Sequence, residues 1–445
     1  MDLKRALADP VRLIPVLFAT AILLGTLALW NPLATADGAQ PPLVTAFFTA
    51  TSAVAVTGLI TVDTPTYWSP FGKGAILLMF QIGGFGIMAS ASLLGLLVGR
   101  GFGLSGRLAT DVERSRLEIG DARSVLRLIL IVTILVEGLL TAILTLRFAY
   151  AYDFAWPKAL WHGLFHAVSA FNNAGFSLNS DSLMGFQHDG FVLVPIMLAV
   201  ILTALGFPVM QDLAAHGHRV SRWSLHTKIT VMGTIVLLAV GFAAILGKEW
   251  ANPETLGPMG VGSKILNAMF HSVMPRTAGF NSLDMGAFED ETLLLNYVLM
   301  FIGGGSAGTA GGIKITTFVV LLVVVASEVA GQRDAAMFGR RFGPSIERQA
   351  LTVAVAATTL IIVASMYILI ITPLEMKDVL FEVISAFSTV GLSTGITGEL
   401  PPSAQVVLAF LMFVGRVGTI TVATALAMGA GRRPYRYPEE NPIVG

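Results

Sequence analysis

The stretch that decides the fold is KDVLFEVISAFSTVGLS, residues Lys377 to Ser393, in which an apolar helical pattern stops at a glycine and continues with polar residues. The pattern occurs three more times, and the four copies align on their glycines, Gly58, Gly175, Gly279 and Gly391. Each glycine is followed by Leu or Phe, and the copies recur roughly every 100 residues, which indicates an internal repeat. We therefore expect four copies of one structural unit.

The copies share further positions before the glycine. Ten residues earlier stand large apolar residues, Phe48, Phe165, Met269 and Phe381. Six residues earlier stand Ser52, Ser169, Val273 and Ser385. This register predicts equivalent side chains behind each glycine.

Each copy has only about a dozen apolar residues before its glycine, whereas a helix needs roughly 20 to cross a membrane. Such a half-helix must enter the membrane and turn back, and the backbone after it is tolerated only where it is buried in protein or lines a water-filled cavity. Glycine permits a positive φ, so carbonyl groups can point along one axis. The helix C-terminus adds the negative end of its dipole. Four such turns around one axis predict a cation site.

Composition places the chain among polytopic membrane proteins, since 54% of its 445 residues are hydrophobic and 13% are charged. The first apolar run, 12–30, is too long for the apolar region of a signal peptide. The net charge of zero gives no support to a nucleic-acid partner. Because cysteine is absent, disulfides and thiolate metal sites are excluded.

We expect an all-α polytopic membrane protein with four parallel membrane–pore-helix–membrane repeats around a pseudo-fourfold pore. Each repeat contains two full spans, eight in all, so the four repeats run in the same direction. The expected division is repeat 1 at 1–99, a cytoplasmic connector at 100–124, repeat 2 at 125–214, a connector at 215–227, repeat 3 at 228–327, a connector at 328–349, repeat 4 at 350–429 and a cytoplasmic tail at 430–445.

Charge predicts the orientation. Most of the 28 lysine and arginine residues lie in the amino terminus, the connectors and the carboxyl tail. Cytoplasmic loops carry such an excess, so both termini are expected in the cytoplasm and the glycine turns should open outward. Acidic residues on the outer side, such as Asp63 and Glu289, would raise the local cation concentration.

Three basic residues, Arg276, Lys314 and Arg416, fall at membrane depth, where ionisable groups are costly and functional by default. Arg276 adjoins the third glycine and is expected to pack against the pore helices through a carboxylate. Arg416 is expected to be an inward-pointing charge below the glycine turns, and a buried ion pair is the alternative.

The run GGGSAGTAGG, Gly303 to Gly312, interrupts the apolar segment of repeat 3. Each glycine costs a helix about 1 kcal/mol relative to alanine, so the run predicts a loop facing a cavity under the third glycine turn. A close-packed small-residue helix face is the alternative. The run also fits a dinucleotide fingerprint, but no strand–helix–strand unit surrounds it. It fits the G-x-S-x-G of serine hydrolases too, yet no histidine follows His271 to act as a base.

Other polar residues in apolar segments are expected to be structural. His162 and His166 have helical spacing but no third metal ligand at a matching position, so hydrogen bonds within the second pore helix are favoured. Glu137, an acid inside an apolar span, is expected to make a helix-packing hydrogen bond rather than to coordinate an ion.

Four such repeats, a single glycine per turn, a glycine-rich break in the third repeat and an arginine in the last span resemble the Trk/Ktr/HKT superfamily of potassium transporters. The most specific pieces are AVTGL, NNAGF, PRTAGF, STVGL, GGGSAGTAGGIKITTF and VGRVGT. The resemblance covers essentially the whole chain. It is strongest to the membrane subunit of bacterial Ktr systems, because the chain has no extra amino-terminal pair of spans.

The resemblance implies gated potassium uptake through the plasma membrane of a bacterium, and no enzymatic activity. Backbone carbonyls of the turns would bind potassium in a filter, and the glycine-rich loop with the last-span arginine would form a gate. The implied filter residues are Val56, Thr57, Gly58, Asn173, Ala174, Gly175, Thr277, Ala278, Gly279, Thr389, Val390 and Gly391. The implied gate residues are Gly303, Gly304, Gly305, Ser306, Gly308, Gly311, Gly312 and Arg416.

The resemblance also implies a homodimer, a cytoplasmic ring of nucleotide-binding regulatory subunits and no cofactor in this chain. Potassium is the implied substrate, and sodium coupling or sodium activation stays open because some relatives depend on sodium. A different function, transport of a small organic solute at broken helices, remains an alternative. The fourfold glycine register argues against it, since a solute site would normally use one pseudo-twofold pair.

Overall fold

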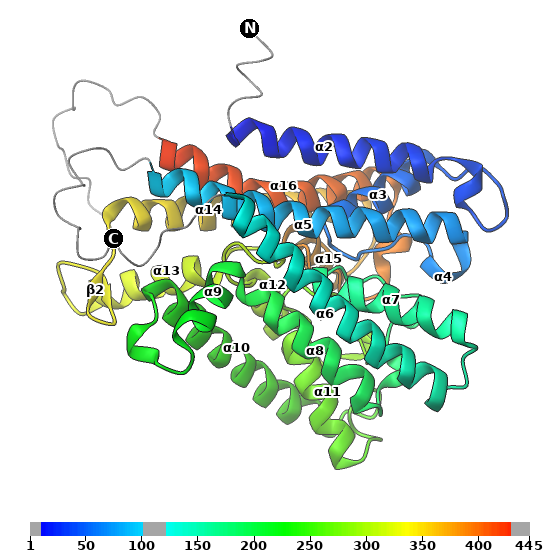
Figure 1. Cartoon of the computed structure of the whole chain (residues 1–445). Helices are drawn as coiled ribbons and strands as arrows, with labels where there is room; N and C mark the ends of the chain where they lie inside the picture. The colour runs from blue at the N-terminus through cyan, green and yellow to red at the C-terminus, as the bar shows by residue number, and fades with distance from the viewer. Residues whose placement is uncertain (1–9, 101–121, 429–445) are drawn as a thin grey trace, which may run out of the picture.

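The computed structural model describes residues 10–100 and 122–428, and the first two quarters follow one order of helices (Figure 1). A long helix is followed by a short one and then by a second long one. The first quarter contains α2 (Pro10–Leu29), α3 (Leu43–Val54), the short turn α4 (Thr64–Tyr67) and α5 (Pro70–Arg100). The second contains α6 (Ala122–Ala151), α7 (Trp156–Asn172), α8 (Gly190–Leu205) and α9 (Phe207–His216).

The same order continues in the second half of the chain. The third quarter contains α10 (Leu225–Glu249), α11 (Val261–Val273), α12 (Asp290–Phe301) and α13 (Ile315–Val329), and the fourth contains α14 (Pro344–Ile371), α15 (Met376–Phe387) and α16 (Pro402–Met428). The strands that the structure describes are β1 (Ala336–Met337) and β2 (Arg340–Arg341), which form a small antiparallel hairpin between α13 and α14. The predicted all-α class is confirmed. Most of the predicted first connector and the tail at 430–445 lie outside the described residues.

Helix length separates two kinds of element. Within the described residues, four helices are long and apolar enough to cross a membrane, in α5, α6, α10 and α14. A fifth span exists if α8 and α9, which are bent by 95° relative to each other, are counted together. The apolar parts of α2, α13 and α16 are shorter within the described residues, so the predicted number of eight spans stays a prediction.

The short helices α3, α7, α11 and α15 lie inside the bundle, and the long helices enclose them. Nine of the 12 residues of α3 are buried, as are eight of the 12 residues of α15. Long helices instead expose apolar side chains on the outside, for example Leu135 and Leu139 of α6, which are 65% and 66% exposed. Such exposure suits lipid surroundings, because lipid chains are as apolar as these side chains.

The first and last quarters meet, so the bundle is closed. Helix α16 contacts α2 and α3, and α2, α5 and α16 lie side by side along one edge of the bundle (Figure 1). The first quarter contacts the second through α5 and α7, the second contacts the third through α8 and α11, and the third contacts the fourth through α12 and α15. Each quarter therefore has one neighbour on either side.

Candidate functional site

The ends of the four short helices carry the predicted filter residues, in four segments that we call the glycine turns (56–58, 173–175, 277–279 and 389–391). Each glycine turn has a positive φ at two places. The glycines have φ values of 94° for Gly58, 69° for Gly175, 74° for Gly279 and 94° for Gly391. Two residues before them the values are 57° for Val56, 59° for Asn173, 73° for Thr277 and 49° for Thr389. A side chain in this conformation costs roughly 1–2 kcal/mol, so the surroundings must hold these residues in place.

The four glycines lie against one another in a closed ring. A methyl group built on Gly58 would lie 2.4 Å from a carbonyl oxygen of the second turn, and one built on Gly175 would lie 2.9 Å from Gly279. Built on Gly279 it would lie 2.5 Å from a carbonyl oxygen of the fourth turn, and built on Gly391 it would lie 2.0 Å from one of the first. These three carbonyl groups belong to Ala174, Val390 and Thr57. Any side chain at the four glycines would push two turns apart.

A serine ties three of the four turns to their own short helices. Ser52 accepts the N–H of its glycine over 3.1 Å, and Ser169 donates to the carbonyl oxygen of the residue after its glycine over 2.8 Å. Ser385 does both, over 3.2 and 2.6 Å. The sequence register indicated that these three serines are equivalent, and their hydrogen bonds show that each holds its own turn.

The third short helix departs from that register by one residue. Phe48, Phe165 and Phe381 are fully buried, but Met269 is 49% exposed, and its neighbour Phe270 is buried instead. The alignment of Met269 with these phenylalanines was therefore wrong. The Phe-His pairs shared by α7 and α11 are the signal that gives the correct register, and the third turn is one residue shorter than the others.

Polar side chains brace the chain just after three of the turns. Glu382, which is 1% exposed, accepts hydrogen bonds from the hydroxyls of Ser393 and, over 2.9 Å, Thr397. At the same helix position, His166 lies 3.0 Å from Ser177 Oγ and His271 lies 3.3 Å from the backbone nitrogen of Ser282. This role of Glu382, His166 and His271 was not predicted from the sequence.

Two structural interpretations from the sequence are confirmed. The Nδ1 atom of His166 lies 2.8 Å from the carbonyl oxygen of His162, within one helix. Glu137 accepts hydrogen bonds from the side-chain amides of Gln81 and Asn172, each over 3.3 Å. Glu137 thereby links α6 to α5 and to the end of α7.

The predicted gate residues other than Arg416 lie in a loop, residues 302–314, that we call the glycine loop. Helix α12 ends at Phe301 and α13 begins at Ile315, so the alternative of a continuous small-residue helix is wrong. The two ends of the loop are joined, because the N–H of Gly303 donates to the carbonyl oxygen of Ile313 over 2.9 Å. Close backbone contact also explains the glycines, since a methyl group on Gly303 would lie 2.0 Å from the carbonyl oxygen of Gly311.

The glycine loop contacts two of the glycine turns. The N–H of Gly311 donates to Thr277 Oγ1 over 3.3 Å. A methyl group built on Gly311 would lie 2.0 Å from Thr389 Oγ1 and 2.5 Å from the carbonyl oxygen of Ser388. From the sequence, the loop was expected under the third glycine turn. The structure shows that the loop also contacts the fourth glycine turn.

The other side of the glycine loop contacts a helix break that the sequence analysis missed. Repeat 2 was expected to contain two full spans, but the second of them bends by 95° at Gly206, where φ is 91°. The N–H of Gly305 donates to the carbonyl oxygen of Ala204 over 2.7 Å, and a methyl group on Gly206 would lie 2.3 Å from that of Ser306. Gly206 stands two residues before Pro208, a pair that favours a helix end.

Arg416 and Lys314 both donate to the glycine loop. Arg416, which is 3% exposed, donates from Nη1 to the carbonyl oxygen of Thr309, and Lys314 donates from Nζ to that of Ala310. Among the residues whose side chains the structure describes, neither forms an ion pair, so the alternative of a buried ion pair for Arg416 has no support. Arg416 instead connects α16 to the loop.

Arg276 differs from its expectation. This side chain is 3% exposed, and its guanidinium donates to Thr234 of α10, over 3.2 Å to the hydroxyl and 3.5 Å to the carbonyl oxygen. In the described part of the chain no carboxylate pairs with it. The predicted carboxylate partner was therefore wrong, and Arg276 ties the third turn to α10.

Comparison with known proteins gives one consistent answer. Residues 5–431 match the family model of TrkH, described as a cation transport protein. The chain is 36% identical to the Ktr system potassium uptake protein B of Bacillus subtilis, covering 98% of this chain and 97% of the relative. It is 35% identical to the potassium/sodium uptake protein NtpJ of Enterococcus hirae, with the same coverage.

A solved structure shows the same fold. The potassium transporter TrkH from Vibrio parahaemolyticus superposes with a TM-score of 0.69 at 19% identity, covering 93% of this chain and 84% of the other. Because the family model spans nearly the whole chain and close relatives match over their full length, the chain belongs to the TrkH family of cation transport proteins.

Proposed function

We propose that the chain carries potassium into the cell along the axis of the four glycine turns. The observation that supports this most is the closed ring of glycines, in which all four carry a positive φ and each turn contacts the next. A filter of this kind replaces the hydration shell of the ion with backbone carbonyl oxygens. Relatives at 34–36% identity are named potassium uptake proteins, and the family is one of transporters rather than enzymes.

The ion ligands would be backbone carbonyls of the twelve filter residues named above. Eleven of these twelve residues are buried, and Gly391 is half-buried, so ions would meet backbone rather than bulk water there. Potassium is the substrate in this proposal, and the chain needs no resident cofactor. Sodium dependence belongs to the same proposal, because one relative is named a potassium/sodium uptake protein.

The glycine loop and Arg416 would form the gate. This assignment is supported by the contacts of the loop with the third and fourth turns and by the hydrogen bond from Arg416 to Thr309. A fixed positive charge beside the path would also repel a passing cation by roughly 4 kcal/mol at 4 Å and an effective dielectric constant of 20. Arg416 would thus hold the glycine loop in place through its hydrogen bond and oppose the passage of cations through its charge.

The proposal also covers the membrane, the orientation of the chain and its partner subunits. We infer a bacterial plasma membrane with both termini in the cytoplasm, four membrane–pore-helix–membrane repeats, a homodimer and a ring of cytoplasmic nucleotide-binding subunits. A complex with further subunits is supported by the names of three relatives, each of which is called a Ktr system potassium uptake protein. The basic connectors support the orientation.

Uptake in cells tests this function. A bacterium lacking its own potassium uptake systems would express the chain with a Ktr-type regulatory subunit, and rubidium or potassium influx would be measured with and without sodium. Saturable influx that restores growth at low potassium supports the proposal. Normal membrane insertion without any influx of either ion would contradict it, and influx of an organic solute would favour the alternative transporter.

The same assay answers the hydrolase alternative. Ser306 has a threonine hydroxyl, Thr316 Oγ1, 3.3 Å from its own Oγ, and no described histidine bonds to it. Ser306→Ala should therefore leave ion uptake near the wild-type rate, whereas it would abolish a serine hydrolase.

A further inference from the structure

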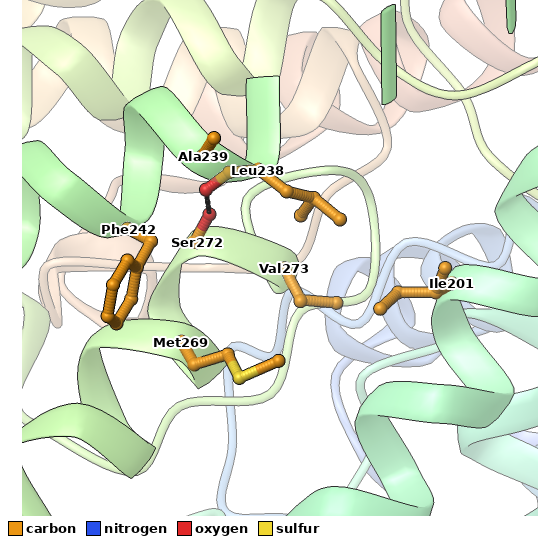
Figure 2. Close-up of a pocket in the computed structure, with 7 residues that line it drawn as sticks. All are labelled: Ile201, Leu238, Ala239, Phe242, Met269, Ser272 and Val273. Atoms are coloured by element: carbon orange, nitrogen blue, oxygen red, sulfur yellow. Dashed lines mark hydrogen bonds between the residues drawn. The ribbon is translucent and has the colours of Figure 1, made fainter. Parts of the chain in front are cut away.

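The third glycine turn is held by different hydrogen bonds from the other three. Helices α3, α7 and α15 hold their turns through Ser52, Ser169 and Ser385. In the register set by Phe270, the equivalent position of the third repeat is Met274, which has no hydroxyl, and the nearby Ser272 donates to the carbonyl oxygen of Leu238 in α10 over 2.7 Å (Figure 2). The third turn thus lacks the serine tie that fixes the others.

One face of α11 also borders a cavity. An apolar cavity of about 280 Å³ lies between α8, α10 and α11, and Figure 2 shows Ile201, Phe242, Met269 and Val273 around it. The cavity opens to the surface, where Met269 is 49% exposed, so this face of α11 is not fully covered by a neighbouring helix. The third turn therefore lacks the serine tie, and its short helix has one incompletely covered face.

Besides its backbone bonds to the end of α11, the third turn is held by contacts with α10 and with the glycine loop. Arg276 reaches Thr234 in α10, and Thr277 Oγ1 accepts the N–H of Gly311 from the glycine loop over 3.3 Å. Thr277 is 1% exposed, so water cannot replace this acceptor easily. In the described residues, Thr389 has no hydrogen-bond partner for its hydroxyl, although it occupies the same place in the fourth turn.

We propose that Thr277 is the positioning residue through which the state of the glycine loop reaches the filter. The proposal rests on the function proposed above. When the loop occupies its described place, its N–H fixes the hydroxyl of Thr277 and so the third turn. When the loop leaves, the third turn loses this contact, and its carbonyl geometry relaxes. Coupling of this kind is reciprocal, so a change at the turn must also alter the stability of the closed loop.

Two substitutions test the coupling, Thr277→Val and, as a control in α6 outside the filter and the glycine loop, Thr133→Val. Both retain a β-branched side chain of similar shape, and both remove one buried hydroxyl. The purified full-length chain would be placed in liposomes without regulatory subunits, and rubidium flux and the rubidium-over-sodium preference would be measured. A buried N–H without a partner destabilises the closed loop, so we expect Thr277→Val to raise basal flux about fivefold and to lower the preference several-fold.

Thr133→Val should leave both quantities within about twofold of wild type, because the buried hydroxyl of Thr133 has no hydrogen-bond partner among the described residues to lose. Thr277→Ser, which keeps the hydroxyl, should restore wild-type values. Equal behaviour of the two valine variants would overturn the proposal, as would higher flux in Thr277→Val with an unchanged ion preference. Hydrogen exchange offers a readout independent of flux, since peptides over 303–312 should exchange faster in Thr277→Val alone.

The outcome separates two failures. If the wild-type chain carries no rubidium or potassium in any assay, the proposed function fails. If the wild type carries the ion and the two valine variants agree with each other, only the coupling fails. Should Thr277→Val not be recovered folded, Thr277→Ala with Thr133→Ala as its control decides the same question.

Discussion

At the residue scale, the four glycines meet two separate demands. Each adopts a positive φ, and each lets the next turn approach to a distance at which a methyl group would collide. The first demand could be met by asparagine at some cost, as Asn173 shows two residues before Gly175. Only glycine meets the second demand, because every other residue carries a Cβ atom.

We expect Gly391→Ala to lower the potassium-over-sodium preference by about tenfold, which corresponds to about 1.4 kcal/mol. The added methyl group would lie 2.0 Å from a carbonyl oxygen of the first turn and must displace it. Competitive rubidium uptake against sodium measures the effect. Gly138→Ala in α6 is the control, since a methyl group there meets no neighbour within 4 Å. An unchanged preference in alanine variants of all four filter glycines would reject the ring as the filter.

Arg416 combines a charge with a hydrogen bond to Thr309. Arg416→Gln should raise basal potassium flux several-fold, because both the electrostatic barrier and the contact with the glycine loop are weakened. Arg416→Lys keeps the charge but loses the planar fork, so its flux should lie closer to wild type. Flux in liposomes measures both. If Lys behaves like Gln, the hydrogen bond rather than the charge closes the path, and loss of uptake in both variants would mean that Arg416 only supports the fold.

At the scale of elements, two broken helices hold each other. The break between α12 and α13 forms the glycine loop, and the break between α8 and α9 at Gly206 receives it. Broken helices free backbone groups that must find partners, and here each break supplies partners to the other. Gly305 donates to Ala204, and Phe207 donates to Ala307 over 3.3 Å. Movement of the loop therefore requires adjustment at the end of α8.

Gly206→Ala tests this link between the two breaks. The alanine would strain a φ of 91° and lie 2.3 Å from the carbonyl oxygen of Ser306, so the closed loop should be displaced. We expect basal flux in liposomes to rise several-fold. Gly217→Ala is the matched control, because its φ is also positive, at 54°, but a methyl group there meets nothing within 4 Å. Equal flux in both variants would show that the break at Gly206 does not support the gate.

Deletion of Gly303 to Gly312 should raise basal potassium flux further than any single substitution. The ends left by the deletion are already neighbours, since Ile302 and Ile313 are bridged, so α12 and α13 can stay in place. Flux in liposomes and circular dichroism of the purified protein check the result. Flux at or below that of wild type, in a variant with intact helix content, would contradict the gate.

At the scale of the whole molecule, the repeat pattern predicted most of the arrangement. The contacts between residues far apart in the sequence were the part that could be predicted least. Four glycines at one register were enough to expect four turns with a positive φ, because glycine adopts this conformation without steric cost. The break at Gly206 escaped notice since the surrounding run is uniformly apolar, although the nearby Pro208 was a usable signal. The shift of α11 escaped because Met269 looks like a core residue by type alone.

Other features had no signal in the sequence. The contact of Arg416 with Thr309 joins residues 107 positions apart, and periodicity carries no information about such pairs. The replacement of the expected carboxylate by Thr234 beside Arg276 is a fact of packing that residue types do not encode. The positive φ of Val56 runs against the preference of a β-branched residue and is imposed by the ring.

The central claim is that potassium binds on the axis of the four glycine turns. Anomalous diffraction from crystals of the chain grown with rubidium in place of potassium tests it most directly, because rubidium has a strong anomalous signal and similar coordination. The account predicts an anomalous peak on the axis, surrounded by backbone carbonyl oxygens of turns 56–58, 173–175, 277–279 and 389–391, and its loss in Gly391→Ala. Rubidium bound only elsewhere in the chain, with an empty glycine ring, would contradict the account.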